Sequence, residues 1–223
     1  MGRTPASAPD PLVRLCQHTQ NSSSPCQAAK RIEISLSNMA VIVSMLRAVN
    51  LGPVNRVKMD ELRSLYESIK LQKPQTYVQS GNVIFQTDER DLVKLGKRIE
   101  TAIERKFGFR TDVILRTSAE MRDTIARNPF AKRNDIEPGK LLVTFLAIDP
   151  GKEGRGKVAQ IKADPEELRI DGRELYIYFP NGAGRSKLAW SAIAKTLKTS
   201  GTARNWNSVT KMHEMALKLE SPV

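Results

Sequence analysis

Arginine, asparagine and glutamine gather in three short stretches, each of which ends or interrupts an apolar run. The stretches read RAVNLGPVN at 47–55, QSGNV at 79–83 and TARNWNSV at 202–209. Arginine holds a carboxylate or phosphate through its planar fork of N–H groups, and the amides of Asn and Gln offer both donors and acceptors. Since a packed core does not call for so many polar groups together, the stretches predict a surface site for a polar or anionic ligand.

A fourth stretch, NGAGRSKLAW at 181–190, is a glycine-containing loop that runs into an expected helix. Ser186 is a natural N-cap for this helix. Backbone N–H groups at such a helix start, together with Arg185 and Lys187, can hold an oxyanion. The spacing GxxxxGK[ST] of a Walker loop is absent, so the stretch does not predict nucleotide triphosphate hydrolysis.

The elements that must position these stretches follow from apolar periodicity. From 40 to 117 the order is strand, helix, strand, strand, helix, strand, with Ser80-Gly81 as a two-residue hairpin connection. Thr117 and Glu120 form a capping box that opens a connecting helix. The same order recurs downstream, with a weak helix around KVAQIKA, a hairpin at Asp171-Gly172 and GTAR as the last strand. The pattern predicts an α+β protein of two ferredoxin-like α/β-sandwich halves with antiparallel sheets, plus a terminal helix.

This topology brings the polar stretches together, because strands joined by a crossover helix run parallel and end at the same edge of the sheet. It also predicts that Arg185 and Arg204 are neighbours. The predicted ligand-binding residues are Arg47, Asn50, Asn55, Lys58, Gln79, Ser80, Asn82, Arg185, Ser186, Lys187, Arg204 and Asn207. A structural interpretation stays open beside this one, in which the asparagines cap turns and helices, as Asn205 is expected to do for the last helix, and Trp206 packs as an anchor.

The order and content of the polar stretches resemble those of the bacterial Domain of Unknown Function 1697 family. SMLRAVNLGPVN, TYVQSGNVIF and TARNWNSV are similar to the family's LLRGINVGG-like opening, YIQSGNVVF hairpin and TARNWNTV close, over roughly residues 39–220. The chain departs from the pattern at Ala48 and Pro53, where the family usually has glycine. The resemblance implies the fold and a bacterial source, but no reaction, because the family's activity is not established.

Composition narrows the function classes. The chain has 36 Lys and Arg against 24 acidic residues, a net charge of +12 and a pI near 9.9, which favours an anionic partner or simple solubility. Both cysteines, Cys16 and Cys26, precede residue 39, and of the two histidines only His213 follows it. We therefore expect no metal site and no cofactor, and a soluble cytoplasmic protein with no membrane span.

Residues 1–38 show no sustained period, so we expect a disordered extension or a misassigned start with translation beginning at Met39. The expected domains are a first half over 39–117, a connecting helix and loop over 118–138, and a second half with the C-terminal helix over 139–223. Three functions compete: binding of a phosphorylated or nucleotide-like small molecule, binding of nucleic acid, and a structural or interaction role in which the polar stretches join the halves. Catalysis stays open, since the polar stretches contain no acid–base pair and no nucleophile with an evident base. The oligomeric state does not follow from the sequence.

Overall fold

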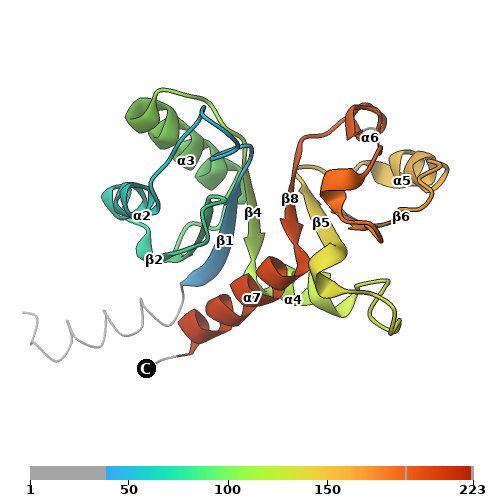
Figure 1. Cartoon of the computed structure of the whole chain (residues 1–223). Coiled ribbons are helices and arrows are strands. Elements are labelled where there is room, and N and C mark those ends of the chain that lie inside the picture. Colours follow the sequence, from blue (N-terminus) through green and yellow to red (C-terminus); the bar gives the residue numbers. More distant parts are fainter. Residues whose placement is uncertain (1–38, 189, 222–223) are drawn as a thin grey trace, which may run out of the picture. The chain divides into compact units, whose positions relative to one another are not determined.

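The computed structural model describes residues 39–188 and 190–221, which form two similar α/β halves (Figure 1). The first half contains β1 (Ala40–Leu46), α2 (Met59–Ser68), β2 (Gln72–Tyr77), β3 (Asn82–Thr87), α3 (Leu92–Phe107) and β4 (Val113–Thr117). The second half contains β5 (Leu141–Leu146), α5 (Gly151–Ala159), β6 (Glu167–Asp171), β7 (Glu174–Tyr178), α6 (Trp190–Leu197) and β8 (Gly201–Asn205). Helix α4 (Ser118–Ala126) follows the first half and α7 (Trp206–Glu220) follows the second, with short 3₁₀ turns η2 (Pro138–Lys140) and η3 (Ala183–Arg185).

Each half holds one four-stranded antiparallel sheet, and the two sheets have the same topology. Their strand orders are β2-β3-β1-β4 and β6-β7-β5-β8. Within each half the first and third strands pair in the centre, and the fourth strand joins the free side of the first. This is the ferredoxin-like order, so the predicted fold class is confirmed.

Local sequence signals place the helix starts. The Asp91 carboxylate accepts from the backbone N–H groups of two first-turn residues of α3. Thr117 and Glu120 form the predicted capping box at the start of α4, and Asn205 caps α7 by accepting from Asn207 N. Each cap satisfies N–H groups that the first helical turn leaves without a partner.

The strands at the centre of each sheet, β1 and β3 in the first and β5 and β7 in the second, are buried on both faces, because helices cover one face and the core between the halves covers the other. On one side of the first sheet, α2 and α3 enclose a core that includes Ile42, Phe85 and Ile99. On the other side, both sheets share a central core with α4 and α7. A third core lies between the second sheet and its helices α5 and α6.

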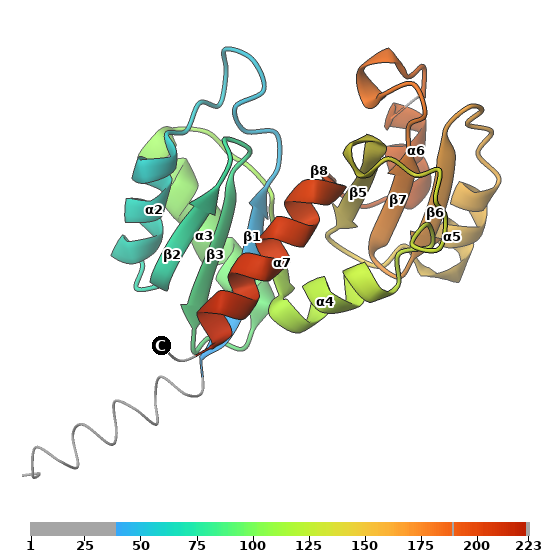
Figure 2. The ribbon, with the colours of Figure 1, turned by 60° about the horizontal axis from the view of Figure 1, so that its bottom comes forward.

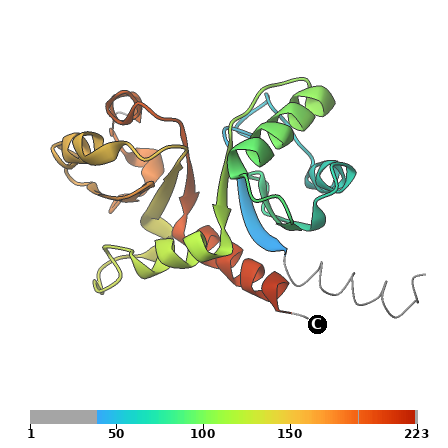
Figure 3. The same ribbon diagram turned by 180° about the vertical axis from the view of Figure 1, so that it is seen from behind.

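Helices α4 and α7, which follow the two halves, pack against each other (Figures 2 and 3). Helix α7 follows β8 of the second half but packs on β1 and β3 of the first, where Gln86 donates to Leu219 O. Helix α4 follows β4 but extends beneath the second sheet, where the Tyr176 hydroxyl donates to Thr124 O. The two terminal helices thus connect the halves.

Two local predictions are wrong. The first hairpin does not turn on two residues: Tyr77 pairs with Asn82, so residues 78–81 form a four-residue connection. Gly81 still has the predicted positive φ, +72°, and Val78 adds a second at +48°. The weak helix of the second half begins earlier than KVAQIKA, at Gly151, and ends at Ala159. Among the described helices, none combines the length and apolar character that a membrane span requires.

Candidate functional site

Arg204 lies on β8 at the centre of a polar cluster that joins the two halves. We define the Arg204 cluster as Leu46, Ser80, Asn82, Thr202 and Arg204. The guanidinium donates from Nε to Asn82 Oδ1 at 2.6 Å, and from Nη2 to Leu46 O at 2.8 Å and Ser80 O at 2.9 Å. Its Nη1 donates to Thr202 Oγ1 at 2.7 Å and to Ala203 O at 2.8 Å. All five N–H groups therefore have protein acceptors, and none is left over for a ligand.

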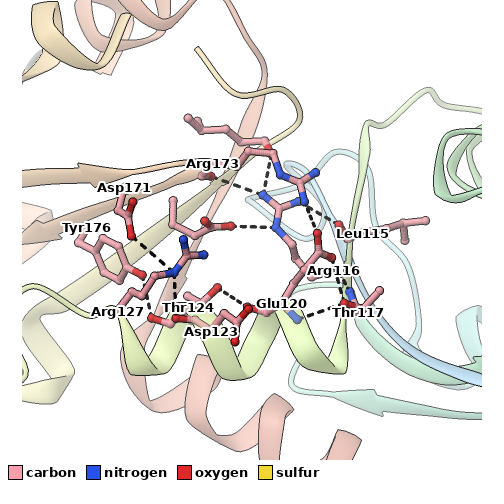
Figure 4. A network of polar contacts seen from close by, with 12 residues as sticks. Leu115, Arg116, Thr117, Glu120, Asp123, Thr124, Arg127, Asp171, Arg173 and Tyr176 are labelled. Atoms are coloured by element: carbon pink, nitrogen blue, oxygen red, sulfur yellow. Dashed lines mark hydrogen bonds and ion pairs between the residues drawn. The ribbon is translucent and has the colours of Figure 1, made fainter. Parts of the chain in front are cut away.

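Arg116 on β4 makes the reciprocal connection from the first half to the second (Figure 4). Its Nε donates to Glu174 Oε1 at 2.9 Å and its Nη2 to Leu146 O at 2.8 Å. Its Nη1 donates to the carbonyl of the preceding residue, Leu115, at 2.9 Å, just as Arg204 donates to Ala203 O. Arg173, beside Glu174, forms an ion pair with Glu120 of α4.

The pairing registers show that these two connections are equivalent. Arg116 is opposite Val43 of β1, and Arg204 is opposite Val143 of β5. On the neighbouring strand, Asn82 is opposite Met45, and Glu174 is opposite Phe145. Each arginine thus reaches the end of the central strand and the start of the third strand in the other half. The chain is an internal duplication whose halves face each other through the same contact, used twice.

One difference breaks this equivalence. Arg116 has a carboxylate partner, whereas Arg204 has the neutral Asn82 in the same place. Burial lowers the pKa of Arg204 to about 10, and no acidic group opposes that effect. Burial also lowers the pKa of Arg116, but the charge of Glu174 acts in the opposite direction. Among the described residues, no acidic group therefore balances the positive charge of Arg204. The guanidinium contacts the carbonyl of Leu46, the residue before Arg47.

The loop between β1 and α2 is held by Asn50. Its Oδ1 accepts from Val57 N at 2.8 Å, and its Nδ2 donates to Val57 O at 3.0 Å and to Gln79 O at 2.7 Å. Asn50 and Asn55 have φ of +56° and +53°, a conformation that asparagine tolerates. Ala48, where the related family usually has glycine, also has a positive φ, +52°. The structure supports the turn-forming interpretation of Asn50, and it confirms that the 47–55 and 79–82 stretches meet.

A cleft with Arg47 at its border lies on the outer face of the second sheet. This Arg47 cleft has a volume of about 310 Å³. It is lined by Arg47, Thr144, Leu146, Leu175, Ile193, Ala194, Leu197, Thr199, Ser200, Gly201 and Ala203. Arg47 is about half exposed and contacts Asp112 through Nη1 alone, at 3.1 Å. The cleft therefore combines apolar walls with one accessible guanidinium.

Thr144 gives this cleft an unsatisfied polar group. Its Oγ1 is one of three buried side-chain atoms without a hydrogen-bond partner among the described residues, and the other two belong to Gln86 and His213. The equivalent residue of the first half is Ser44, whose hydroxyl is bonded to the Tyr66 hydroxyl at 2.7 Å. The second half has no such tyrosine on α5, so the buried Thr144 hydroxyl lacks the partner that Ser44 has.

A second cleft of about 400 Å³ lies on the other side of Arg47, but its charges neutralise one another. Lys97 contacts Glu100 at 2.7 Å and Arg110 contacts Glu104 at 2.7 Å, while Arg47 contacts Asp112. The lining of this cleft holds three cations and three acids, so it has no net charge to attract an anion, whereas, among the described residues, Arg47 is the only charged one that lines the Arg47 cleft.

The remaining predicted residues lie in several places. Lys58 is exposed and approaches Glu61 at 3.7 Å, and Asn207 is exposed on the first turn of α7. The ends of β7 and β8 share one edge of the sheet, with β5 between them. Arg185 and Lys187 are exposed in the η3 loop, whereas Arg204 is buried with its guanidinium directed at the first half. No hydrogen bond among the described residues joins these four exposed side chains to the Arg204 cluster.

The N-cap assignment of Ser186 is wrong. Helix α6 begins only at Trp190, and the Ser186 hydroxyl instead accepts from Leu188 N at 3.0 Å within the loop. Ser186 has extended backbone angles after the turn η3, so its side chain closes a local turn before the chain becomes helical. The proposed oxyanion site at the start of α6 thereby loses its cap.

Three informative residues were missed from the sequence, namely Arg116, Thr144 and Glu174. A usable signal for Arg116 was present, because it precedes the N-cap Thr117 just as Arg204 precedes the N-cap Asn205. Nothing in a single sequence shows that Thr144 lacks a partner. No group of three or more His, Cys, Asp or Glu residues suited to a metal ion occurs in the part of the chain that the structure describes.

Together, the two similar sheets, the terminal helices and the reciprocal arginines define a protein of two ferredoxin-like halves, with a cleft beside β8. The chain belongs to the family described as "Protein of unknown function (DUF1697)", whose sequence profile matches residues 39–176. Among solved structures, it resembles the conserved bacterial protein SP0830 from Streptococcus pneumoniae, with a TM-score of 0.60 and 20% sequence identity over 80% of this chain and 99% of that one. A search of curated proteins finds no match.

Proposed function

We propose that the protein binds a small molecule with an apolar body and an anionic group in the Arg47 cleft. The observation that carries the proposal is Thr144, which lines a cleft of about 310 Å³ and whose buried hydroxyl has no partner. A buried polar group without a partner is unfavourable, so its presence calls for an explanation, and a ligand that approaches the cleft wall is one. The cleft volume lies at the lower end of the range for small-molecule sites.

The anionic class follows from the charges near the cleft. Arg47 has N–H groups free of Asp112, since only Nη1 contacts that carboxylate. The uncompensated charge of Arg204 lies close behind, because its Nη2 donates to the carbonyl of Leu46. An anion at the mouth of the cleft would be attracted by both guanidinium groups but contacted only by Arg47. A nucleotide-like molecule, whose base has a flat ring face that can pack on apolar walls and whose phosphate is anionic, fits this description.

The other two functions have less support. RNA-recognition domains of this topology bind through the sheet face that their helices leave open. Here those faces form the central core with α4 and α7, and the aromatic side chains on them, Phe145, Tyr176 and Tyr178, are buried. The joining role describes Arg204 and Asn82 well, yet it gives no reason for the cleft or for the unsatisfied hydroxyl.

The test uses two dyes that differ mainly in charge, 8-anilino-1-naphthalenesulfonate and the neutral N-phenyl-1-naphthylamine. We expect the sulfonate to bind more tightly, and Arg47→Gln to weaken it about tenfold, or about 1.4 kcal/mol, while the neutral dye is unaffected. Arg56→Gln is the matched control, because Arg56 is an exposed cation of the same loop that does not line the cleft. Ala194→Phe should block both dyes.

Thr144→Val separates a ligand-binding hydroxyl from a structural one. The two side chains have nearly the same shape, so the variant should be as stable as the wild type or more stable, yet bind the sulfonate more weakly. Arg47→Lys keeps the positive charge but loses the planar fork of N–H groups. It should therefore lower the affinity for nucleoside monophosphates more than it lowers nonspecific binding of anions, which chloride screens. Equal binding of both dyes to all variants would refute the proposal, and tight salt-sensitive binding of short RNA alone would favour the nucleic-acid function.

A further inference from the structure

Strand β8 is the edge of the second sheet that faces the first half, and it lines the Arg47 cleft (Figure 1). Ala147 N donates to Ser200 O at 2.9 Å, so these residues form a hydrogen-bonded pair between the chain segments of β5 and β8. Because bonded and non-bonded pairs alternate along an antiparallel ladder, the next residue, Gly201, directs its N–H and C=O away from β5. The residue opposite Gly201 is Leu146, whose N–H donates to a carbonyl beside β7, which agrees with this direction.

The equivalent position of the first half is closed by a side chain. Arg116 and Arg204 occupy the same place in their sheets, so Val113 of β4 corresponds to Gly201 of β8. The N–H of Val113 donates to Glu100 Oε1 of α3 at 3.2 Å. Helix α6, WSAIAKTL, has no acidic residue, and among the described residues no side chain forms a hydrogen bond with the backbone of Gly201. The second half thus leaves a backbone donor and acceptor open at the cleft.

This open edge has the hydrogen-bonding pattern that complements a nucleobase. The N–H and C=O of one edge residue pair with a ligand that has an acceptor beside a donor. Adenine and cytosine present a ring nitrogen beside an amino group, and guanine and uracil present a carbonyl beside a ring N–H. Ala203 leaves room beside the edge, because the first half has the larger Leu115 at the equivalent position. A flat base can therefore bind Gly201 as a neighbouring strand would, with its ring faces on the apolar walls of the cleft.

The group that attracts anions lies close to this edge. Thr202, the residue after Gly201, donates through Oγ1 to Leu46 O at 3.4 Å, and Arg47 follows Leu46. Gly201 and Arg47 are thus each one residue away from a direct contact between the halves, so one small molecule can contact both. We propose, resting on the function proposed above, that the ligand of the Arg47 cleft is a nucleoside monophosphate, whose base pairs with the backbone of Gly201 and whose phosphate contacts Arg47.

The test compares phosphates by isothermal titration calorimetry with the full-length protein. The compound 1-naphthyl phosphate has an apolar ring system but no hydrogen-bonding edge, and the monophosphates of adenosine, guanosine, cytidine and uridine add that edge. We expect at least one of these nucleotides to bind about tenfold more tightly than 1-naphthyl phosphate, since a bidentate contact to a base edge contributes about that much. Ribose 5-phosphate is the control without a base and should bind more weakly than that nucleotide. Arg47→Gln should weaken the nucleotide and 1-naphthyl phosphate by the same factor, so that their ratio is unchanged.

The amide proton of Gly201 reports the contact directly. Glycine follows serine only at Gly81 and Gly201, so protein labelled with carbonyl-¹³C serine and ¹⁵N glycine gives two selected amide signals, and Ser80→Ala removes that of Gly81. We expect the nucleotide to shift the Gly201 proton downfield and 1-naphthyl phosphate not to do so. Nucleotides that bind no more tightly than 1-naphthyl phosphate or than ribose 5-phosphate, or that bind without this shift, would overturn the inference but leave the proposed function intact. If neither 1-naphthyl phosphate nor any nucleotide binds, the proposed function fails as well.

Discussion

Replacing each cross-half arginine by methionine should have different consequences, because the partners left behind differ. Arg204→Met would strand neutral oxygens, namely Leu46 O, Ser80 O and Asn82 Oδ1. Arg116→Met would strand the carboxylate of Glu174, which is 5% exposed. Methionine fills much of the arginine volume in both variants, so the comparison isolates the polar partners.

The expected losses of unfolding free energy follow from the cost of leaving each kind of buried group without its partner. A buried acceptor without a donor costs about 1–3 kcal/mol, and rearrangement of the loop at Ser80 would relieve part of this, so Arg204→Met should cost about 2–4 kcal/mol. Removing one partner of a buried ion pair costs about 3–5 kcal/mol. Against a typical total stability of about 5–15 kcal/mol, both variants should fold, with Arg116→Met the less stable at pH 7.

The pH dependence separates the two explanations. In Arg116→Met the stranded Glu174 carboxylate is disfavoured in the folded state, so the folded protein binds a proton there more readily than the unfolded chain does. Stability relative to wild type should therefore be greatest near pH 4 and fall as the pH rises toward 7. In Arg204→Met the stranded groups do not titrate, so its loss of stability should be the same at both pH values.

Urea denaturation at pH 4 and pH 7 measures these differences, with Arg122→Met as a surface control, since Arg122 is 67% exposed. The double variant Arg116→Met/Glu174→Leu should recover most of the stability lost by Arg116→Met alone. Two outcomes would refute this reasoning: a loss of unfolding free energy in Arg116→Met that does not change with pH, or no recovery in the double variant. Either would show that Arg116 and Glu174 do not act as an ion pair that sets this contact apart from the contact of Arg204 with Asn82.

Three further outcomes are expected. Gly81→Val should cost about 1–3 kcal/mol in urea titrations, well beyond Ser80→Ala, because Gly81 has a φ of +72° and a side chain there would approach existing atoms at 2.6 Å; similar small losses for both would contradict this. Tyr66→Phe should cost about 1 kcal/mol by removing the bond to Ser44, and no loss would show that bond to be dispensable. Removing residues 1–38 should leave the thermal melt unchanged, and a large drop in melting temperature would reject that expectation.

Much of the fold could be predicted because local signals agreed with the topology. Apolar periodicity located the central strands, and the residues at Thr117 and Asn205 are the caps that the sequence indicated. The N-cap prediction for Ser186 was wrong, because a serine side chain in a loop closes a local turn as readily as it caps a helix. The predicted length of the first hairpin connection was wrong, because a glycine with positive φ fits both a two-residue and a four-residue connection.

The site was predicted only in part, for a different physical reason. Topology alone indicates that residues 47–55 and 79–82 meet, and they do. It does not reveal which half a side chain faces, so Arg204 was expected to bind a ligand although its donors join the halves. Such a contact depends on how the halves pack, and that arrangement leaves no periodic signal in one sequence.

The internal duplication indicates where function should be sought. Two halves that share a topology and a reciprocal contact have the same structural needs, so a feature present in both is explained by folding. Two of the features present in one half alone are Arg47 where the other half has Ala147, and the unsatisfied Thr144 where the other has the bonded Ser44. Since the fold does not require these differences, each of them is a better candidate for function than the asparagine-rich stretches that first draw attention.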